Sequence, residues 1–263
     1  KYKITVVPFK VDLGEMKNLP GNIYQKIKEA EKRGLKSFVT TSQPSPGDFL
    51  TAFKEKLKEF EEIICITVTS KHSGTFNSAI QAKSFLPEKE KIHVVDSMSV
   101  SSGEGLVILK AVNLIEKGFE TKEILKKLKE SILKTNLIFM LKDPKWAENS
   151  GRIPKILGIF LRKMQNLGFY PLLGIKKGKI SLVGVKKNVK DMASALLDEF
   201  QKRLETKQKV NVAITHADNE SEAKKLANLI KGFKNCEIKF INIIGEIVGG
   251  LAGPGAVTLA WQT

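Results

Sequence analysis

Apolar residues in the first half of the chain fall into short strand-like runs separated by longer runs with helical spacing. The strand-like runs are rich in β-branched residues and lie at 4–11, 37–40, 63–68 and 92–97. Between the first two, apolar residues recur at helical spacing, at Ile23, Ile27 and Ala30. Strands that alternate with helices of this length are typical of βαβ units. We therefore predict a Rossmann-like α/β domain built on a parallel sheet.

The pattern changes after a strand-like run at 137–141. Two further runs, 171–175 and 179–185, flank a short turn that contains Gly178 and predict a β-hairpin. The remaining predicted elements are helices at 154–167, 189–204 and 221–231, strands at 209–215 and 237–241, and a glycine-rich tail at 245–262 that ends in a strand. We predict a second α/β domain with a mixed sheet, and divide the chain into domains 1–140 and 141–263.

Hydroxyl-bearing side chains gather in two loops, each of which leads from a predicted strand into a predicted helix. The first loop contains Thr41 and Ser42, and the second spans 70–75 around Gly74. A helix N-cap accounts for Ser45 in the first loop, but Thr41 and Ser42 lie at the carboxyl end of a strand, where open α/β sheets bind ligands. Unpaired N–H groups and the helix dipole make helix N-termini good anion sites. We predict that the two loops together hold one small anionic group.

Two further residues are candidates for the same site, each with a structural alternative. Ser97 ends the strand-like run 92–97, directly after Asp96. It either belongs to the site or lies in an Asx turn that closes the strand. Arg152 stands in an apolar stretch near the predicted domain junction. It pairs either with a carboxylate for structural reasons or with a ligand anion across the cleft.

Composition narrows the classes of function. The chain of 263 residues has a net charge of +16, but only four of its 44 basic residues are arginine, the residue that nucleic-acid readers prefer for bidentate contacts. Lysines dispersed among glutamates are typical of a solvated surface. No apolar run is long enough to span a membrane. Cys65 and Cys236 indicate buried thiols, and the start of the chain shows no signal peptide, so we expect a cytoplasmic protein without membrane insertion.

The sequence offers little support for catalysis or for a metal. Ser73 lacks a G-x-S-x-G frame, and the base nearest to it in sequence is His72. The three histidines and two cysteines have no metal-ligand spacing, and the stretch 249–255 lacks the context of a dinucleotide fingerprint. We expect no catalytic residue, no metal and no cofactor. Two alternatives stay open: a hydrolase or transferase that uses Ser73, and a basic nucleic-acid-binding protein.

Several segments, in order along the chain, resemble the DegV family of bacterial fatty-acid-binding proteins. The segments are Val6-Val7-Pro8-Phe9, Thr41-Ser42-Gln43-Pro44-Ser45, Ser73-Gly74-Thr75-Phe76-Asn77-Ser78-Ala79, Val95-Asp96-Ser97, Gly151-Arg152-Ile153, His216-Ala217-Asp218-Asn219-Glu220 and Gly253-Pro254-Gly255. The resemblance implies two α/β domains with a long-chain fatty acid such as palmitate between them. It places the carboxylate on Thr41 and Ser73, and the other expected ligand-binding residues are Ser42, Gly74, Thr75, Ser97 and Arg152.

The resemblance also implies a role and a partner. The protein would be a non-catalytic carrier or sensor, and some members of the family present the bound acid to a separate fatty acid kinase. Leu251 stands where the family commonly has a histidine near the headgroup, which implies a different contact there. The family's usual first strand, ending in Thr-Asp-Ser, has no counterpart in this sequence. Candidates for the acyl tunnel are apolar side chains of the second domain, each with ordinary core packing as the alternative that its pattern favours: Leu157, Ile159, Phe160, Leu161, Met164, Phe169 and Leu172.

Overall fold

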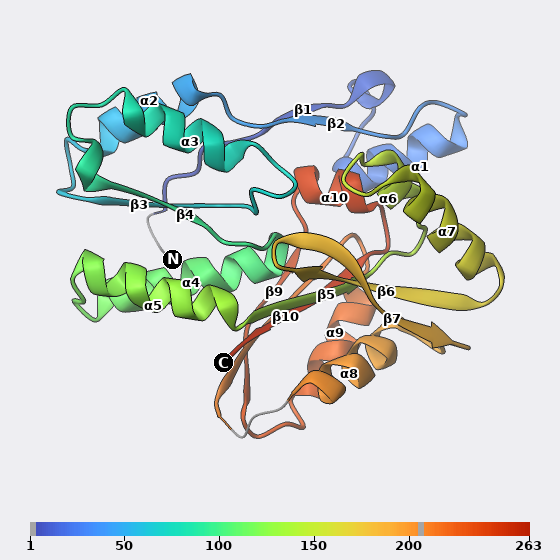
Figure 1. The fold of residues 1–263 in the computed structure, drawn as a ribbon. Helices are drawn as coiled ribbons and strands as arrows, with labels where there is room; N and C mark the ends of the chain where they lie inside the picture. The colour runs from blue at the N-terminus through green and yellow to red at the C-terminus, as the bar shows by residue number, and fades with distance from the viewer. Residues whose placement is uncertain (1–3, 205–207) are drawn as a thin grey trace.

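The computed structural model describes residues 4–204 and 208–263, and arranges them as layers of helices and sheets (Figure 1). The first part of the chain contributes β1 (Lys10–Asp12), the 3-10 helix η1 (Gly14–Met16), α1 (Ile23–Lys32), β2 (Thr40–Ser42), α2 (Pro46–Lys56), β3 (Ile63–Thr67), α3 (Thr75–Ser84), the 3-10 helix η2 (Lys89–Lys91), β4 (Ile92–Asp96), α4 (Ser101–Glu116) and α5 (Thr121–Leu133). The predicted alternation of strands and helices is therefore present.

Strands β3 and β4 pair in parallel and are covered by helices on both faces (Figure 1). Ile63 and Cys65 of β3 pack with the α2 and α3 side chains, whereas Ile64 and Ile66 pack against α4 and α5. Successive side chains of a strand point to opposite faces, so a strand covered on both sides must be apolar throughout. This explains the apolar run over residues 63–66 that predicted β3.

The first strand is shorter than predicted. Of the run at 4–11, only its last two residues lie in a strand, and β1 pairs antiparallel with β2 in a separate two-stranded sheet. The strand predicted at 37–40 likewise begins only at Thr40. Pairing with β1 fixes the position of β2, with Val11 opposite Thr41. The prediction was wrong for 4–9 because the apolar side chains of this segment line a cavity, described below, without a strand partner.

The second part of the chain builds a six-stranded sheet. Its elements are β5 (Thr135–Met140), α6 (Lys145–Asn149), α7 (Lys155–Asn166), β6 (Phe169–Lys176), β7 (Lys179–Lys187), α8 (Met192–Arg203), β8 (Val210–His216), α9 (Glu220–Ile230), β9 (Cys236–Ile243), α10 (Glu246–Ala252) and β10 (Val257–Gln262). The strand order is β7-β6-β5-β10-β8-β9, with β8 and β9 parallel and the other neighbours antiparallel. The predicted hairpin and mixed sheet are confirmed.

Helix α4 lies between the β3–β4 pair and the six-stranded sheet. Its residue Leu106 packs with Leu137, Ala213 and Ala260 of the six-stranded sheet, while Val107 belongs to the cluster that includes Ile64 and Ile66 of β3. Helices α8 and α9 cover the opposite face of the six-stranded sheet (Figure 1). Strand β5 lies inside this sheet although the predicted division assigns it to the first domain, and the division itself stays a prediction.

Helix α10 was missed because its glycines argued against a helix. The structure gives those glycines a packing role, since a Cβ on Gly249 would collide with the Tyr24 ring and one on Gly250 with Val39. The hydroxyl of Tyr24 donates a hydrogen bond of 2.6 Å to the carbonyl of Ile244, just before α10. Close approach of α1 to α10 therefore outweighs the low helix propensity of glycine.

Candidate functional site

A cavity of about 1040 Å³ lies between the layer of β3 and the six-stranded sheet. Its walls come from the segment 4–9, from β3 and α4, from β5 and β6, and from α10. This volume is that of a site for a small molecule, and its walls are mostly apolar. Polar side chains gather at one end, where the loops after β2 and β3 meet the segment that follows α6. The loop after β3, residues 69–75, is called the hydroxyl loop below.

Arg152 and Thr41 form one pair at this polar end. The Nη2 group of Arg152 donates to Thr41 Oγ1 at 2.9 Å, and its Nη1 group donates to the carbonyl of Ser150 at 2.6 Å. Within residues 4–204 and 208–263, no carboxylate forms an ion pair with Arg152. The structural alternative considered for this arginine, a carboxylate partner, is therefore absent from the described part of the chain. Its charge remains available to an anion in the cavity.

Ser73 and Thr75 form a second pair at the start of α3. Their hydroxyl oxygens are 2.7 Å apart, and the N–H of Thr75 donates to Ser73 Oγ at 3.3 Å. Gly74 packs so closely on the side chain of Gln43 that a Cβ would collide with it, and Gln43 donates to Ser78 Oγ at 3.1 Å. These contacts hold the loops after β2 and β3 together.

His72 lies beside this cluster and is uncharged at neutral pH. Burial lowers its pKa, and the neighbouring charges of Arg152 and Lys179 lower it further. Its Nε2 accepts a hydrogen bond of 2.7 Å from the N–H of Ile180, so the proton resides on Nδ1. The lone pair that a serine nucleophile would require is thus already occupied, which counts against a hydrolase built on Ser73.

The expected ligand-binding residues do not all face the cavity. Thr41, Ser73, Thr75 and Arg152 line it, whereas Ser42 is exposed outside it. Ser97 is buried, and its hydroxyl donates to the carbonyl of Ser99 and accepts from the N–H of that residue. The N–H of Met98 donates to Asp96 Oδ1 at 2.8 Å, which is the Asx turn considered as the alternative. Gly74 serves the packing of the loops and does not line the cavity.

The candidate tunnel residues of the second domain do not face the cavity. None of the seven side chains named from α7 and β6 lines the cavity. Leu161 and Leu172 are buried in other clusters, while Ile156 and Phe160 on the outer face of α7 are 83% and 49% exposed. Helix α7 is amphipathic and covers β6 and β5 with one face, so its apolar residues stabilise that packing. The sequence could not tell this packing from a ligand wall.

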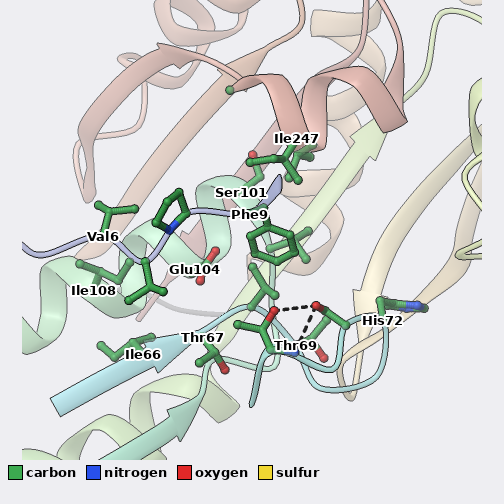
Figure 2. Close-up of a pocket in the computed structure, with 18 of the residues that line it drawn as sticks. Val6, Phe9, Ile66, Thr67, Thr69, His72, Ser101, Glu104, Ile108 and Ile247 are labelled. Carbon is green, nitrogen blue, oxygen red and sulfur yellow. Dashed lines mark hydrogen bonds between the residues drawn. The ribbon is translucent and has the colours of Figure 1, made fainter. Parts of the chain in front are cut away.

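The actual apolar wall follows β3 and α4. Figure 2 shows Ile66 and Ile108 facing Val6 and Phe9 across the cavity. Beyond them, Val112 and Ile115 of α4 continue the wall toward the far end. Leu251 of α10 also lines the cavity.

Glu104 is a polar residue within this wall that sequence reasoning missed. It lies in the first turn of α4, and its side chain points into the cavity (Figure 2). Burial raises its pKa to about 8, with a smaller contribution from the charge of Asp96. The available signal was an acidic residue in a helix that is otherwise apolar over most of 101–115.

Among the helices that the structure describes, none combines the length and the apolar character that a membrane span requires.

Comparisons with known proteins agree with this architecture. A family described as uncharacterised proteins, the DegV family, matches residues 1–263. A DegV domain-containing protein of Clostridium acetobutylicum is 31% identical over 274 residues, which cover 97% of this chain and 90% of that protein.

Two solved structures have similar folds. The first, described as fatty acid binding of a DegV family protein from Thermus thermophilus, has a TM-score of 0.85 at 25% identity and covers 98% of this chain and 91% of that one. The second is the Streptococcus pneumoniae Fatty Acid Kinase B3 protein loaded with linoleic acid. It has a TM-score of 0.81 at 23% identity, and the match covers 97% of this chain and 90% of that one. The second likeness concerns the fold alone.

Proposed function

Since the chain belongs to the DegV family, we propose that it binds one long-chain fatty acid in the cavity and acts as a non-catalytic carrier or sensor. One observation carries the proposal. A mostly apolar cavity of about 1040 Å³ ends at Thr41, Ser73 and an arginine, Arg152, that has no carboxylate partner within the described residues. An elongated molecule with a long apolar part and one anionic end matches both features.

The polar end suits a carboxylate. A partly buried guanidinium without a counter-ion is unfavourable, and an anion placed beside it regains that energy. The hydroxyls of Thr41 and Ser73 can each donate one hydrogen bond to a carboxylate oxygen. In the structure they are held by Arg152 and Thr75, so that the donors are already gathered before a ligand arrives. Preorganised donors reduce the cost of binding.

The apolar channel supplies most of the affinity. Transfer of each methylene from water contributes about 0.8 kcal/mol, so an acyl chain of about fifteen methylenes gains on the order of 12 kcal/mol before ordering costs. The walls made by Ile66, Ile108 and Val112 offer dispersion contacts to an acyl chain but no hydrogen-bonding groups. The length of chain that fits is set by the far end, near Ile115.

Presentation of the bound acid to a fatty acid kinase is the partner we propose. The support is the shared fold with the Streptococcus pneumoniae protein, which is named for such a kinase. Leu251 makes the α10 wall apolar at the family's usual histidine position. The role that the family gives to that histidine would therefore fall to Arg152 or to the neutral His72 in this chain.

Mass spectrometry of the organic extract of purified protein tests the proposal. We expect one long-chain fatty acid per chain, or stoichiometric uptake of palmitate or oleate by protein that has been stripped of lipid. A nucleic-acid-binding protein would instead show binding that falls steeply with salt, and a serine hydrolase would react with a serine-directed phosphonate. An empty extract together with no uptake would contradict the proposal.

A further inference from the structure

Glu104 has a position that the binding of a plain acyl chain does not explain. Its side chain points into the apolar part of the cavity, among Val6, Ile66 and Ile108 (Figure 2). Over residues 4–204 and 208–263 its carboxyl group forms no hydrogen bond and no ion pair. A carboxyl group that lies buried without a partner is costly, and such groups are normally paired.

Its protonation state defines what it can bind. Because burial and the charge of Asp96 raise the pKa of Glu104 to about 8, the carboxyl is mostly neutral at pH 7. Asp96 itself accepts hydrogen bonds from the N–H groups of Ser70 and Met98, so it is not a partner for Glu104. A neutral carboxyl has one O–H donor and further acceptor positions. It therefore complements a neutral group that both donates and accepts, such as a hydroxyl.

The first turn of α4 places Glu104 close to the polar end of the cavity. The N–H of Thr69, in the hydroxyl loop, donates to the carbonyl of Ser99 at 2.8 Å, which fixes the start of α4 beside that loop. At about 1.5 Å per residue, Glu104 lies about 4.5 Å beyond Ser101 along the helix axis, and Ile115 lies about 21 Å beyond Ser101. Glu104 thus faces the part of a bound chain that is nearer to its carboxylate.

A role for Glu104 in the helix alone does not account for this placement. Acidic residues favour the first turn of a helix because of its dipole, but that interaction is available to a side chain that points to solvent. Here the side chain faces the cavity instead, where the ionised form is disfavoured. The feature that remains to be explained is a neutral donor and acceptor inside an apolar channel.

We propose that Glu104 hydrogen-bonds a hydroxyl group on the ligand's acyl chain, so that the site prefers long-chain acids hydroxylated in their carboxyl-proximal part over the unsubstituted acids. This inference rests on the proposed function of the same cavity. A site that hydrogen-bonds a ligand hydroxyl discriminates against the analogue that lacks it, because the buried partner is then left unpaired. A purely apolar wall discriminates against a hydroxyl only weakly.

Calorimetric titration of lipid-free protein tests the inference. The ligands are palmitate and a series of hydroxypalmitates in which the hydroxyl is moved along the chain. We expect the tightest binding for a carboxyl-proximal hydroxyl, about tenfold tighter than for palmitate, as one recovered hydrogen bond predicts. Glu104→Leu should remove this preference, and Glu104→Gln, which keeps a donor and an acceptor, should retain most of it. Glu130→Leu on the exposed surface of α5 is the matched control and should retain it fully.

The outcomes separate this inference from the proposed function. Equal affinity of the wild-type protein for palmitate and all hydroxypalmitates would overturn the inference and leave fatty-acid binding intact. The same preference in the wild type and in Glu104→Leu would also overturn it. Equal losses for all ligands in Glu104→Leu would mean that Glu104 contacts the carboxylate instead of a chain hydroxyl. If the wild-type protein bound none of these acids, the proposed function would fail as well.

Discussion

The polar end of the cavity and its apolar channel are built on different principles. At the polar end, side chains from separate loops hold one another: Arg152 donates to Thr41, Ser73 contacts Thr75, and His72 accepts from the backbone of Ile180. Along β3 and α4 the wall is mostly made of aliphatic side chains, and Glu104 and Thr67 are polar exceptions without a side-chain hydrogen bond among the described residues. Under the proposed function, the polar end would fix the position of the ligand, whereas the channel would supply affinity and set the preferred chain length.

The strongest test of this division removes the hydroxyl donors. The double variant Thr41→Val with Ser73→Ala should weaken palmitate binding by about 3–6 kcal/mol, because each hydrogen bond to a charged group contributes about 1.5–3 kcal/mol. Calorimetric titration measures the change, and circular dichroism checks the fold. Ser42→Ala, on the same strand but outside the cavity, should leave the affinity unchanged. An unaltered affinity in the double variant would contradict the proposal that Thr41 and Ser73 bind the carboxylate.

Blocking the far end of the channel should change length selectivity. In Val112→Trp the larger side chain fills the space that the last methylenes of a long acid would occupy. Loss of about four buried methylenes predicts a penalty of about 3 kcal/mol for stearate, with little change for laurate. Affinities measured across a series of chain lengths check this. A uniform loss at every length would mean that the acyl chain runs elsewhere or that the fold is disturbed.

Glu104 should make the stability of the lipid-free protein depend on pH. Its pKa is raised from 4.5 to about 8 in the fold, mainly by burial. Between these two values the folded state binds more protons than the unfolded state, so the free energy of unfolding falls as pH rises through this window. Glu104→Gln removes that loss. At about 1.4 kcal/mol per pKa unit the upper bound is about 5 kcal/mol, and we expect about 2 kcal/mol because the group faces a cavity that water can enter.

Urea unfolding at pH 5 and pH 8.5 (roughly the two ends of the window) measures this difference. The quantity of interest is the stability of Glu104→Gln relative to the wild type, which should increase from the lower to the higher pH. Glu116→Gln, at the exposed end of the same helix, is the control and should show no such increase. A difference that is constant with pH would contradict the assignment of a neutral Glu104.

The smallest expected effect concerns α7, whose apolar residues were predicted from sequence to line the tunnel. Ile156→Ser changes a side chain that is 83% exposed, and should alter neither fatty-acid affinity nor stability by more than about 0.5 kcal/mol. Titration and urea unfolding measure both quantities. A large loss of affinity for all acids would bring α7 back into the site and contradict the cavity described by the structure.

The polar end was more predictable than the channel for a physical reason. Thr41 lies on β2 and Ser73 in the loop after β3, and each position precedes a helix that the sequence pattern marks clearly. Which apolar residues face a cavity depends on how whole layers pack, and an amphipathic helix such as α7 has the same sequence pattern over a sheet as over a ligand. The fold of both halves followed from periodicity, whereas α10 did not, because close packing at Gly249 and Gly250 outweighed propensity.

Ser97 illustrates the same limit at shorter range. Its position after β4 placed it at the correct edge of the sheet, but the Asx turn made by Asp96 rotates its hydroxyl into the loop, where it bonds to Ser99. Element order therefore predicts the neighbourhood of a side chain, and local hydrogen bonding decides its direction.

A crystal structure of the palmitate complex tests the central claim most directly. The account predicts density for a carboxylate in contact with Thr41, Ser73 and Arg152, and for an acyl chain that runs along β3 and α4 past Glu104 toward Ile115. A carboxylate at the opposite end, near Lys56, or an acyl chain lying against α7 would contradict it.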